Sequence, residues 1–389
     1  MKKTGVIWMA AVLSVLLLSA CSGQGKGGAT AGEEDRAGAC DTADISAPRY
    51  AKGFTVRTLA DGVRLVDVAD PQTDEERMPV SYRFALVRRG SQAEVPEGYT
   101  RVEVPIERTI VMTMLQMSNF TALNAHDVIR GITGVKNLFD KDIRERVERG
   151  DIVKIGMEGN FDTELILSAN PQVIFISPFK RGGYDVVKET GITLVPHLGY
   201  KEQDPLGQAE WVKYVAMFLG KETEADSLFR GIEARYLDLK QKAADVAERP
   251  TVFSGEMHGG NWFAVGGKNY LAQIFRDAGA DYLIDDDNTG GVNIDYEQMY
   301  ATAAEADYWR ILNSFEGDFG YDALLASEPR NALFRAFKQH HVIYCNMKQT
   351  PYYEISPVMP DAVLADFVAI FHPELMPADY TPTFYSLLP

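Results

Sequence analysis

The pattern of apolar and polar positions predicts strands that alternate with helices through most of the chain. Short continuous apolar runs, typical of parallel strands buried on both faces, occur at residues 109–114, 173–176, 193–195, 251–253 and 342–344. Helical periodicity follows several of these runs. The alternation predicts an α/β fold class, with mostly parallel sheets that carry helices on both faces.

Two predicted helices without an intervening strand interrupt this alternation. The first covers residues 206–219 and ends at Gly220, a residue type that is favoured just after a helix. The second covers residues 222–247, where apolar positions recur at helical spacing until Pro250 stops the helix. No hinge rich in Gly and Ser separates the α/β parts on either side. We therefore expect one long helix to join two lobes rigidly, so that they move little.

The beginning of the globular part has a different pattern. Residues 54–56 and 63–66 flank Asp61-Gly62, which is a strong signal for a β-hairpin. Residues 82–87 predict another strand. We expect an antiparallel section here that decorates the first lobe.

The first 21 residues predict export. Lys2 and Lys3 precede an apolar run over residues 6–18, and small residues follow, as in a secretory signal peptide. The sequence Leu-Ser-Ala-Cys that ends at Cys21 resembles the lipobox of bacterial lipoproteins, which implies cleavage before Cys21 and lipidation of its thiol. The run is shorter than the roughly 20 apolar residues of a membrane-spanning helix. A plain secretory signal remains the alternative. We expect a lipid-anchored protein of the cell envelope that faces the periplasm or the exterior.

The predicted domain organisation follows from these patterns. The segments are a lipoprotein signal peptide (1–20), a flexible tether (21–48), an N-terminal α/β lobe (49–205), linking helices that include the long one (206–248) and a C-terminal α/β lobe (249–389).

Charge excludes some classes of partner. The chain has 39 Lys and Arg against 55 Asp and Glu, and its net charge of −16 becomes −18 when the signal peptide with its two lysines is removed. An acidic surface argues against nucleic acid and anionic lipid as partners.

The cysteines leave one question open. Cys21 is assigned to lipid, Cys40 lies in the tether and Cys345 lies in a strand-like run. Export permits a disulfide between Cys40 and Cys345, whereas the surroundings of Cys345 favour a small buried residue.

Several motifs resemble a known family, the type III solute-binding proteins of ABC importers. The similar segments span residues 105–375 and include 108–111, 132–135, 161–174, 220–222 and 371–375, with Gln172 where the family usually has Asp. The resemblance implies two Rossmann-like lobes joined by one long rigid helix, with a ligand cleft between the lobes. It also implies that the protein is a receptor for a ferric siderophore, haem or cobalamin. Such a receptor works with an ABC permease and its ATPase.

The resemblance also implies two docking residues. Glu164 and Glu297 occupy the positions at which one exposed glutamate on each lobe contacts arginines of the permease. Two distant carboxylates on one face would give a basic partner a defined register. Each is alternatively an ordinary acid in the first turn of a helix, where it favours the helix dipole.

Candidate ligand contacts lie in the loops that follow the predicted strands, because open α/β sheets bind ligands at the carboxyl ends of their strands. They are Met114, Gln116, Phe179, Lys180, Arg181, His258, Asn261, Trp262, Tyr352 and Tyr353. Aromatic walls with a few polar groups suit a large, partly apolar chelate, and Lys180 and Arg181 could pair with its carboxylate or catecholate oxygens. Met114 is equally well explained by core packing. His258 could ligate a haem iron or lie on the surface, and only one of two adjacent tyrosines on an extended segment would face the cleft.

Catalytic and metal-binding motifs do not stand out. The sequence has no G-x-S-x-G, H-E-x-x-H or G-x-x-x-x-G-K-[ST] pattern, so we expect no enzyme. Six scattered histidines give no metal-ligand spacing, so a metal, iron or cobalt, is expected only inside a bound chelate. A cobalamin receptor, a direct receptor for Zn²⁺ or Mn²⁺ and an exported enzyme that acts on a chelate remain alternatives. We expect a monomer.

Overall fold

A computed structural model describes residues 44–72, 80–134, 138–157, 159–178 and 184–389. The predicted signal peptide, Cys21, Cys40 and the three candidates Phe179, Lys180 and Arg181 lie outside the described residues. The unit formed by Ala43–Pro389 contains both predicted lobes. No helix in the described part of the chain is long and apolar enough to span a membrane.

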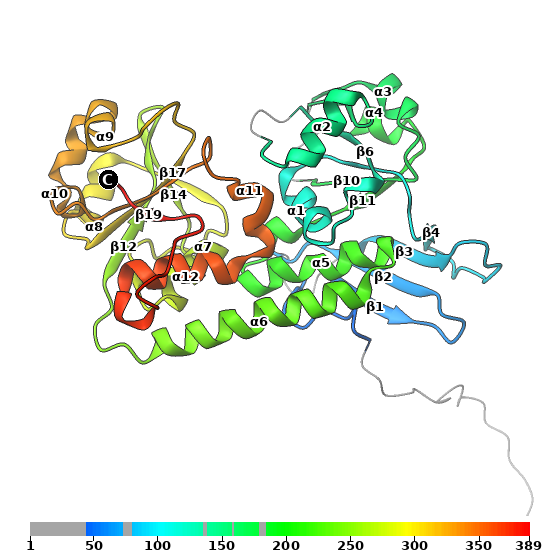
Figure 1. The fold of residues 1–389 in the computed structure, drawn as a ribbon, viewed down its shortest axis with the longest axis horizontal. Coiled ribbons are helices and arrows are strands. Elements are labelled where there is room, and N and C mark those ends of the chain that lie inside the picture. Colours follow the sequence, from blue (N-terminus) through cyan, green and yellow to red (C-terminus); the bar gives the residue numbers. More distant parts are fainter. Residues whose placement is uncertain (1–43, 73–79, 135–137, 158, 179–183) are drawn as a thin grey trace, which may run out of the picture. The chain divides into compact units, whose positions relative to one another are not determined.

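The first lobe is built on a five-stranded parallel sheet with the order β11-β10-β5-β6-β7 (Figure 1). Its strands are β5 (Thr109–Val111), β6 (Ile129–Ile132), β7 (Val153–Lys154), β10 (Val173–Ile176) and β11 (Thr193–Pro196). The other elements are α1 (Met114–Ala122), α2 (Lys141–Arg149), α3 (Thr163–Ser168), α4 (Asp185–Lys188) and the short pair β8 (Gly156–Met157) and β9 (Asn160–Phe161). Because the chain winds outward from β5 in both directions, the carboxyl ends of β5 and β10 form a switch point, where α/β sheets bind ligands.

The second lobe has a sheet with the order β15-β12-β17-β18-β19, parallel except for the last strand. Its strands are β12 (Thr251–Ser254), β15 (Asp281–Tyr282), β17 (Tyr308–Asn313), β18 (Val342–Asn346) and β19 (Ser386–Leu387). A separate antiparallel sheet contains β13 (Glu256–His258), β14 (Asn261–Val265) and β16 (Gly291–Ile294). The helices are α7 (Tyr270–Asp277), α8 (Tyr296–Ala303), α9 (Tyr321–Ser327), α10 (Arg335–Lys338), α11 (Tyr352–Ile355) and α12 (Pro360–Phe371). The predicted α/β class with two lobes is confirmed.

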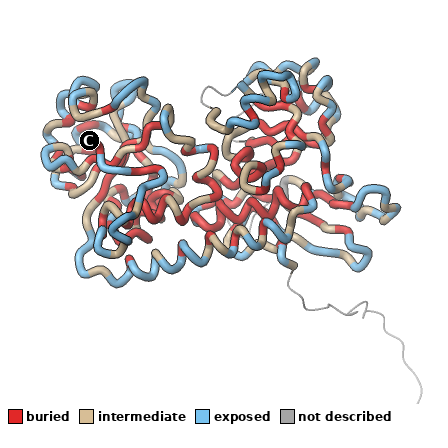
Figure 2. Tube along the Cα trace, viewed as in Figure 1, coloured by how far each residue is buried: buried red, intermediate tan, exposed pale blue. Residues whose placement is uncertain are grey.

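Two helices connect the lobes, α5 (Pro205–Leu219) and α6 (Glu222–Ala244). Asp204 caps α5 through its side chain, and Gly220 ends it in the left-handed conformation that the sequence predicts. The second helix ends at Ala244, earlier than predicted. Every residue of α5 is buried, because the helix packs between other elements of the fold (Figure 2).

The N-terminal section forms a four-stranded sheet of β1 (Phe54–Thr58), β2 (Arg64–Ala69), β3 (Val80–Arg88) and β4 (Thr100–Val104). The hairpin of β1 and β2 is confirmed. The prediction of an antiparallel section is wrong in one respect, because β4 pairs with β3 in parallel. The residues between β3 and β4 cross from one end of the sheet to the other, and sequence analysis did not predict β4.

Buried carboxylates attach this N-terminal section to the connecting helices. The Oε2 atom of Glu210, which is fully buried in α5, accepts hydrogen bonds from the amides of Arg49, Tyr50 and Ala51 at 2.8, 2.7 and 3.0 Å. Its other oxygen lies 3.3 Å from the buried ammonium of Lys213. One buried side chain therefore satisfies three backbone donors and one cation.

We predict that Glu210→Ala destabilises the protein by at least about 3 kcal/mol, because it leaves three backbone amides without their acceptor and leaves the buried ammonium of Lys213 with Asp226 as its one remaining acidic neighbour among the described residues. Urea unfolding followed by circular dichroism measures this change. Glu305→Ala, at an exposed acid of the second lobe, is the matched control and should change stability by less than about 0.5 kcal/mol. Equal stability of the two variants would contradict the anchoring role of Glu210.

Candidate ligand-binding site

A cavity of about 780 Å³ lies between the two lobes. One side of it is lined by Leu115 of α1, by Tyr200 in the turn before α5 and by Gln208 of α5. The second lobe contributes the carboxyl ends of its strands and the sheet of β13, β14 and β16. These residues are Gly255, Glu256, Met257, His258, Phe263, Ala264, Val265, Asn269, Tyr270, Leu271, Gly290, Gly291, Arg310, Leu312, Asn313, Met347, Tyr352, Tyr353, Ser356 and Pro357. The position agrees with the prediction that the cleft lies between the lobes at strand ends.

A buried guanidinium forms the polar base of the cavity. Arg310, in the middle of β17, is 6% exposed and donates to the hydroxyl of Tyr385 through Nε at 3.1 Å and through Nη2. No carboxylate of the described residues forms an ion pair with it. Burial opposes its charge, but the nearby phenols of Tyr385 and Tyr352 raise the pKa of Arg310 above its ordinary value. The cavity therefore holds a permanent cation without an acidic partner.

Phenol groups surround this cation. Tyr270, Tyr352 and Tyr353 line the cavity, and the ring of Tyr352 packs against the rings of Tyr353 and Tyr385. Burial raises the pKa of Tyr352 and of Tyr270 well above the ordinary value, so both hydroxyls stay protonated at neutral pH. They are neutral hydrogen-bond donors that reinforce the preference of Arg310 for an acceptor or an anion.

The C-terminal tail completes this arrangement. The carboxylate of Asp366 in α12 accepts hydrogen bonds from the Tyr380 hydroxyl at 2.6 Å and from the amides of Thr383, Phe384 and Tyr385 at 2.9, 2.7 and 2.9 Å. Asp366 is fully buried. It fixes the tail so that Tyr385 reaches Arg310.

Phe263, and not Trp262, faces the cavity. Trp262 is fully buried, donates to the carbonyl of Ser254 at 2.9 Å and packs against Trp309. The ring of Phe263 is 52% exposed and lines the cavity. Successive side chains of a strand point to opposite faces, and sequence analysis chose the wrong one of the two neighbours on β14. The structure thus places Trp262 in the core of the second lobe.

The first strand of the N-terminal lobe is followed by a helix, where a loop was predicted. Gln116 is fully buried, and its side-chain oxygen accepts from the amides of Met112 and Thr113 at 2.9 and 3.2 Å, in a capping box at the start of α1. Met114 is half-buried against the core and does not line the cavity. Leu115, between them, is the residue of α1 that does.

The remaining candidates are divided between the cavity and the surface. Tyr352 and Tyr353 both line the cavity, because they lie on the short helix α11 and not on an extended segment. His258 is exposed and lines the cavity as well, whereas Asn261 is exposed and does not. Within the described residues no group of three or more His, Cys, Asp or Glu side chains is placed to hold a metal ion.

Sequence analysis missed Arg310, Glu256 and Phe263. Arg310 stands alone in an apolar strand, which is a signal of a buried charge that calls for a partner, but Tyr385 is distant in sequence. Cys345 is buried and unpaired among the described cysteines, and burial raises the pKa of its thiol to about 12.

The two proposed docking glutamates are on the surface of different lobes. Glu164 is exposed in the first turn of α3, after the capping residue Asp162. Glu297 lies in the first turn of α8 with its side chain 83% exposed, 3.8 Å from the guanidinium of Arg330. That guanidinium also pairs with Glu328 at 2.8 Å, so Glu297 shares its cation with a second acid.

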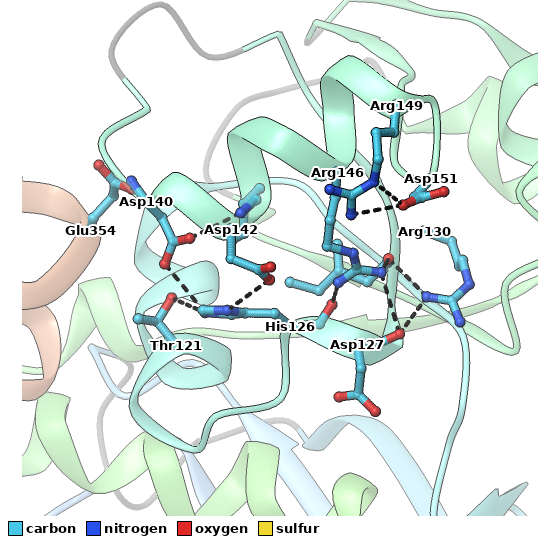
Figure 3. A network of polar contacts seen from close by, with 12 residues as sticks. Thr121, His126, Asp127, Arg130, Asp140, Asp142, Arg146, Arg149, Asp151 and Glu354 are labelled. Atoms are coloured by element: carbon cyan, nitrogen blue, oxygen red, sulfur yellow. Dashed lines mark hydrogen bonds and ion pairs between the residues drawn. The ribbon is translucent and has the colours of Figure 1, made fainter.

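The carboxylate of Glu354 joins the two lobes beside the cavity. Glu354, next to the cavity tyrosines on α11, accepts hydrogen bonds from the amides of Phe139 and Asp140 at 2.7 and 2.9 Å. Figure 3 shows Asp140 between Glu354 and His126, whose two ring nitrogens lie 3.3 Å from the carboxylates of Asp140 and Asp142. Burial raises the pKa of Glu354, and its hydrogen bonds with the two amides oppose this shift. A side chain of the second lobe thus caps the entry to α2 in the first.

Comparison with known proteins identifies the family. The model of the family described as periplasmic binding protein matches residues 111–348, which is more than half of the chain. The chain belongs to the periplasmic binding protein family. It is a solute-binding protein and not an enzyme.

Similar sequences and structures agree with this assignment. An uncharacterised lipoprotein of Methanocaldococcus jannaschii is 30% identical over 304 residues, which cover 73% of this chain and 69% of the relative. A second lipoprotein of that organism is 28% identical over 312 residues, covering 77% and 78%. A periplasmic binding protein of Veillonella parvula has a TM-score of 0.59 at 14% identity and covers 82% of this chain and 98% of its own. A periplasmic heme binding protein of Pseudomonas aeruginosa has a TM-score of 0.57 at 19% identity, covering 73% and 98%.

We predict that Glu354→Ala in this binding protein speeds hydrogen exchange at the amides of Phe139 and Asp140 by about tenfold or more. Hydrogen bonds to a charged acceptor contribute about 1.5–3 kcal/mol, and each 1.4 kcal/mol is a factor of ten. Exchange monitored by mass spectrometry of the peptide around α2 measures the effect. Glu305→Ala is the control, and unchanged protection in the Glu354 variant would contradict the contact between the lobes.

Proposed function

We propose that this protein is the substrate-binding lipoprotein of an ABC transporter, which captures an iron complex, a ferric siderophore or haem, and delivers it to an inner-membrane permease. The family assignment supports solute capture. Relatives that are named lipoproteins support attachment through Cys21 and a place in the cell envelope. Solved structures of similar fold include heme-binding proteins of Pseudomonas aeruginosa and Vibrio cholerae.

The observation that carries the proposal is the unpaired Arg310 at the base of an aromatic cavity. A buried cation is costly unless a partner compensates its charge, and among the described residues Arg310 has no carboxylate within ion-pair distance and donates to the neutral hydroxyl of Tyr385. The ligand is therefore expected to supply the anion. Iron chelates do so through carboxylate, hydroxamate or catecholate oxygens, and their apolar parts fit against Phe263 and Tyr353.

The metal is expected to arrive inside the chelate. The cavity offers phenols, one guanidinium, one imidazole and one carboxyl group, which suit recognition of the outer groups of a ligand. Cobalamin, which carries a phosphodiester and many amides, is the alternative ligand of the same class.

We predict that the purified protein changes its intrinsic tryptophan fluorescence on titration with one member of a panel of haem, cyanocobalamin and ferric hydroxamate and catecholate siderophores, at sub-micromolar concentration. Trp262 and Trp309 pack directly beneath the cavity wall and provide the signal. Arg310→Met should weaken that binding by about tenfold or more, because it removes a charge-assisted hydrogen bond in a desolvated site.

Three outcomes separate the alternatives of this experiment. A response to one chelate that Arg310→Met weakens supports the proposal and names the ligand. A response to bare Zn²⁺, Mn²⁺ or Fe³⁺ alone would replace it with a direct metal receptor. No response to any member of the panel by folded protein, checked by circular dichroism, would refute it.

We predict further that reversing both docking charges, in the double variant Glu164→Lys and Glu297→Lys, abolishes uptake in vesicles that contain the cognate permease. Ligand affinity should stay unchanged, because neither residue lines the cavity. The matched control is Glu148→Lys with Glu305→Lys, which reverses one exposed acid on each lobe. Full transport by the docking variant would show that Glu164 and Glu297 are not needed for contact with the permease.

A further inference from the structure

We propose that Glu256 determines which chelate the cavity accepts: its carboxyl group selects a ligand with a hydrogen-bond donor on the side away from Arg310 and disfavours a second anionic group there. The inference rests on the proposed function and adds a constraint on the ligand. The part of the cavity around Arg310 requires an acceptor or an anion on the ligand, and the part around Glu256 requires a hydrogen-bond donor.

The backbone holds Glu256 in this position. Gly255 joins β12 to β13 with a φ of 103°, and a Cβ at this position would lie 2.0 Å from the carbonyl oxygen of Phe263. Only glycine fits this close approach without a shift of the backbone. The bend takes the chain out of the parallel sheet and directs the next residue, Glu256, to the cavity wall.

Neighbouring side chains fix the orientation of its carboxyl group. The Tyr344 hydroxyl donates to Oδ1 of Asn313 at 2.8 Å, which leaves the amide nitrogen of Asn313 to donate to Oε1 of Glu256 at 3.2 Å. This bond is the one that the described residues make to the carboxyl group. The second oxygen, Oε2, therefore remains available to a ligand.

The charges around Glu256 favour a hydrogen-bond donor on the ligand over an anionic group. Arg310 and His258 are close enough to favour its negative charge, but neither forms an ion pair with it. Tyr344 is the other titratable group beside it. Burial raises the pKa of Glu256 despite the opposing effects of Asn313, Arg310 and His258, so these neighbours compensate the carboxylate incompletely. A donor on the ligand supplies that compensation, whereas a ligand carboxylate at the same place adds repulsion.

The class of ligand follows from the requirements of Arg310 on one side of the cavity and of Glu256 on the other. Its acceptor or anionic oxygens lie against Arg310 and the phenols of Tyr352 and Tyr353. An ammonium, amide or hydroxyl group lies against Glu256. A ferric hydroxamate with a free amine has this distribution of groups, whereas haem, with two carboxylates, and a trianionic ferric catecholate do not.

The isosteric variant Glu256→Gln tests the inference. It removes the charge and retains an oxygen that can accept from Asn313. Glu305→Gln makes the same chemical change at an exposed position of the same lobe and serves as control. Both variants and the wild type are titrated with ferrioxamine B, its N-acetylated form, haem and ferric enterobactin, and with any other chelate of the panel that the wild type binds.

The expected result has opposite signs for the two kinds of ligand. Glu256→Gln should lower the affinity for ferrioxamine B by about tenfold and the affinity for the N-acetylated form by less than about threefold. Only ferrioxamine B itself loses a charge-assisted hydrogen bond. The same variant should raise the affinity for haem and for ferric enterobactin by at least about threefold, because it removes the repulsion between Glu256 and the anionic groups of these ligands.

Other outcomes overturn the inference and distinguish it from the proposed function. If Glu256→Gln leaves the affinity of every bound chelate equal to that of Glu305→Gln, weakens both forms of ferrioxamine B equally, or weakens haem or ferric enterobactin, Glu256 is not a selector, and capture of a chelate still stands. If the folded wild type binds none of the chelates, the proposed function fails, and the inference fails with it.

Discussion

The arrangement of the whole unit depends on one buried helix, α5. Elements of both lobes, the N-terminal sheet and α6 pack on it, so that none of its residues remains exposed. A charged side chain on a helix so enclosed is costly unless it has a partner in the protein. Glu210 does so with the chain that enters the first sheet and with Lys213. Because these bonds are specific in direction, they fix the position of the sheet on the helix more firmly than apolar contact alone would.

The chemistry of the cavity depends in turn on the end of the chain. Asp366 satisfies three successive amides of the tail and one hydroxyl, and Tyr385 is thereby held against Arg310. The hydroxyl is a neutral partner, so it supports the guanidinium without cancelling its charge. The described tail thus supports Arg310 without supplying a negative charge, which is the basis for proposing an anionic ligand.

Sequence analysis predicted the architecture well and the site less well, for a physical reason. Runs such as residues 173–176 report burial on both faces, and Gly220 reports a helix end, because these properties are local to a few residues. The direction of Phe263 and Trp262 is not local: alternation says that the two neighbours point to opposite faces, and the packing of Phe253 and Trp309 decides which face is the core. The partners of Arg310 and Glu354 lie far along the chain, so no spacing in the sequence reports them.

The helix α11 relates the cavity to the contact between the lobes. Tyr352 and Tyr353 line the cavity, and the next residue, Glu354, holds the amides before α2. Three consecutive residues of one helical turn cannot move independently, because their backbone is fixed by the same hydrogen bonds. A change in the angle between the lobes would break the bonds of Glu354, displace both tyrosines from the base of the cavity and disturb the packing of α1 against α11. The lobes are therefore held together on the side of α11 as well as through α5 and α6, and a cavity held in this way is expected to be formed before the ligand arrives.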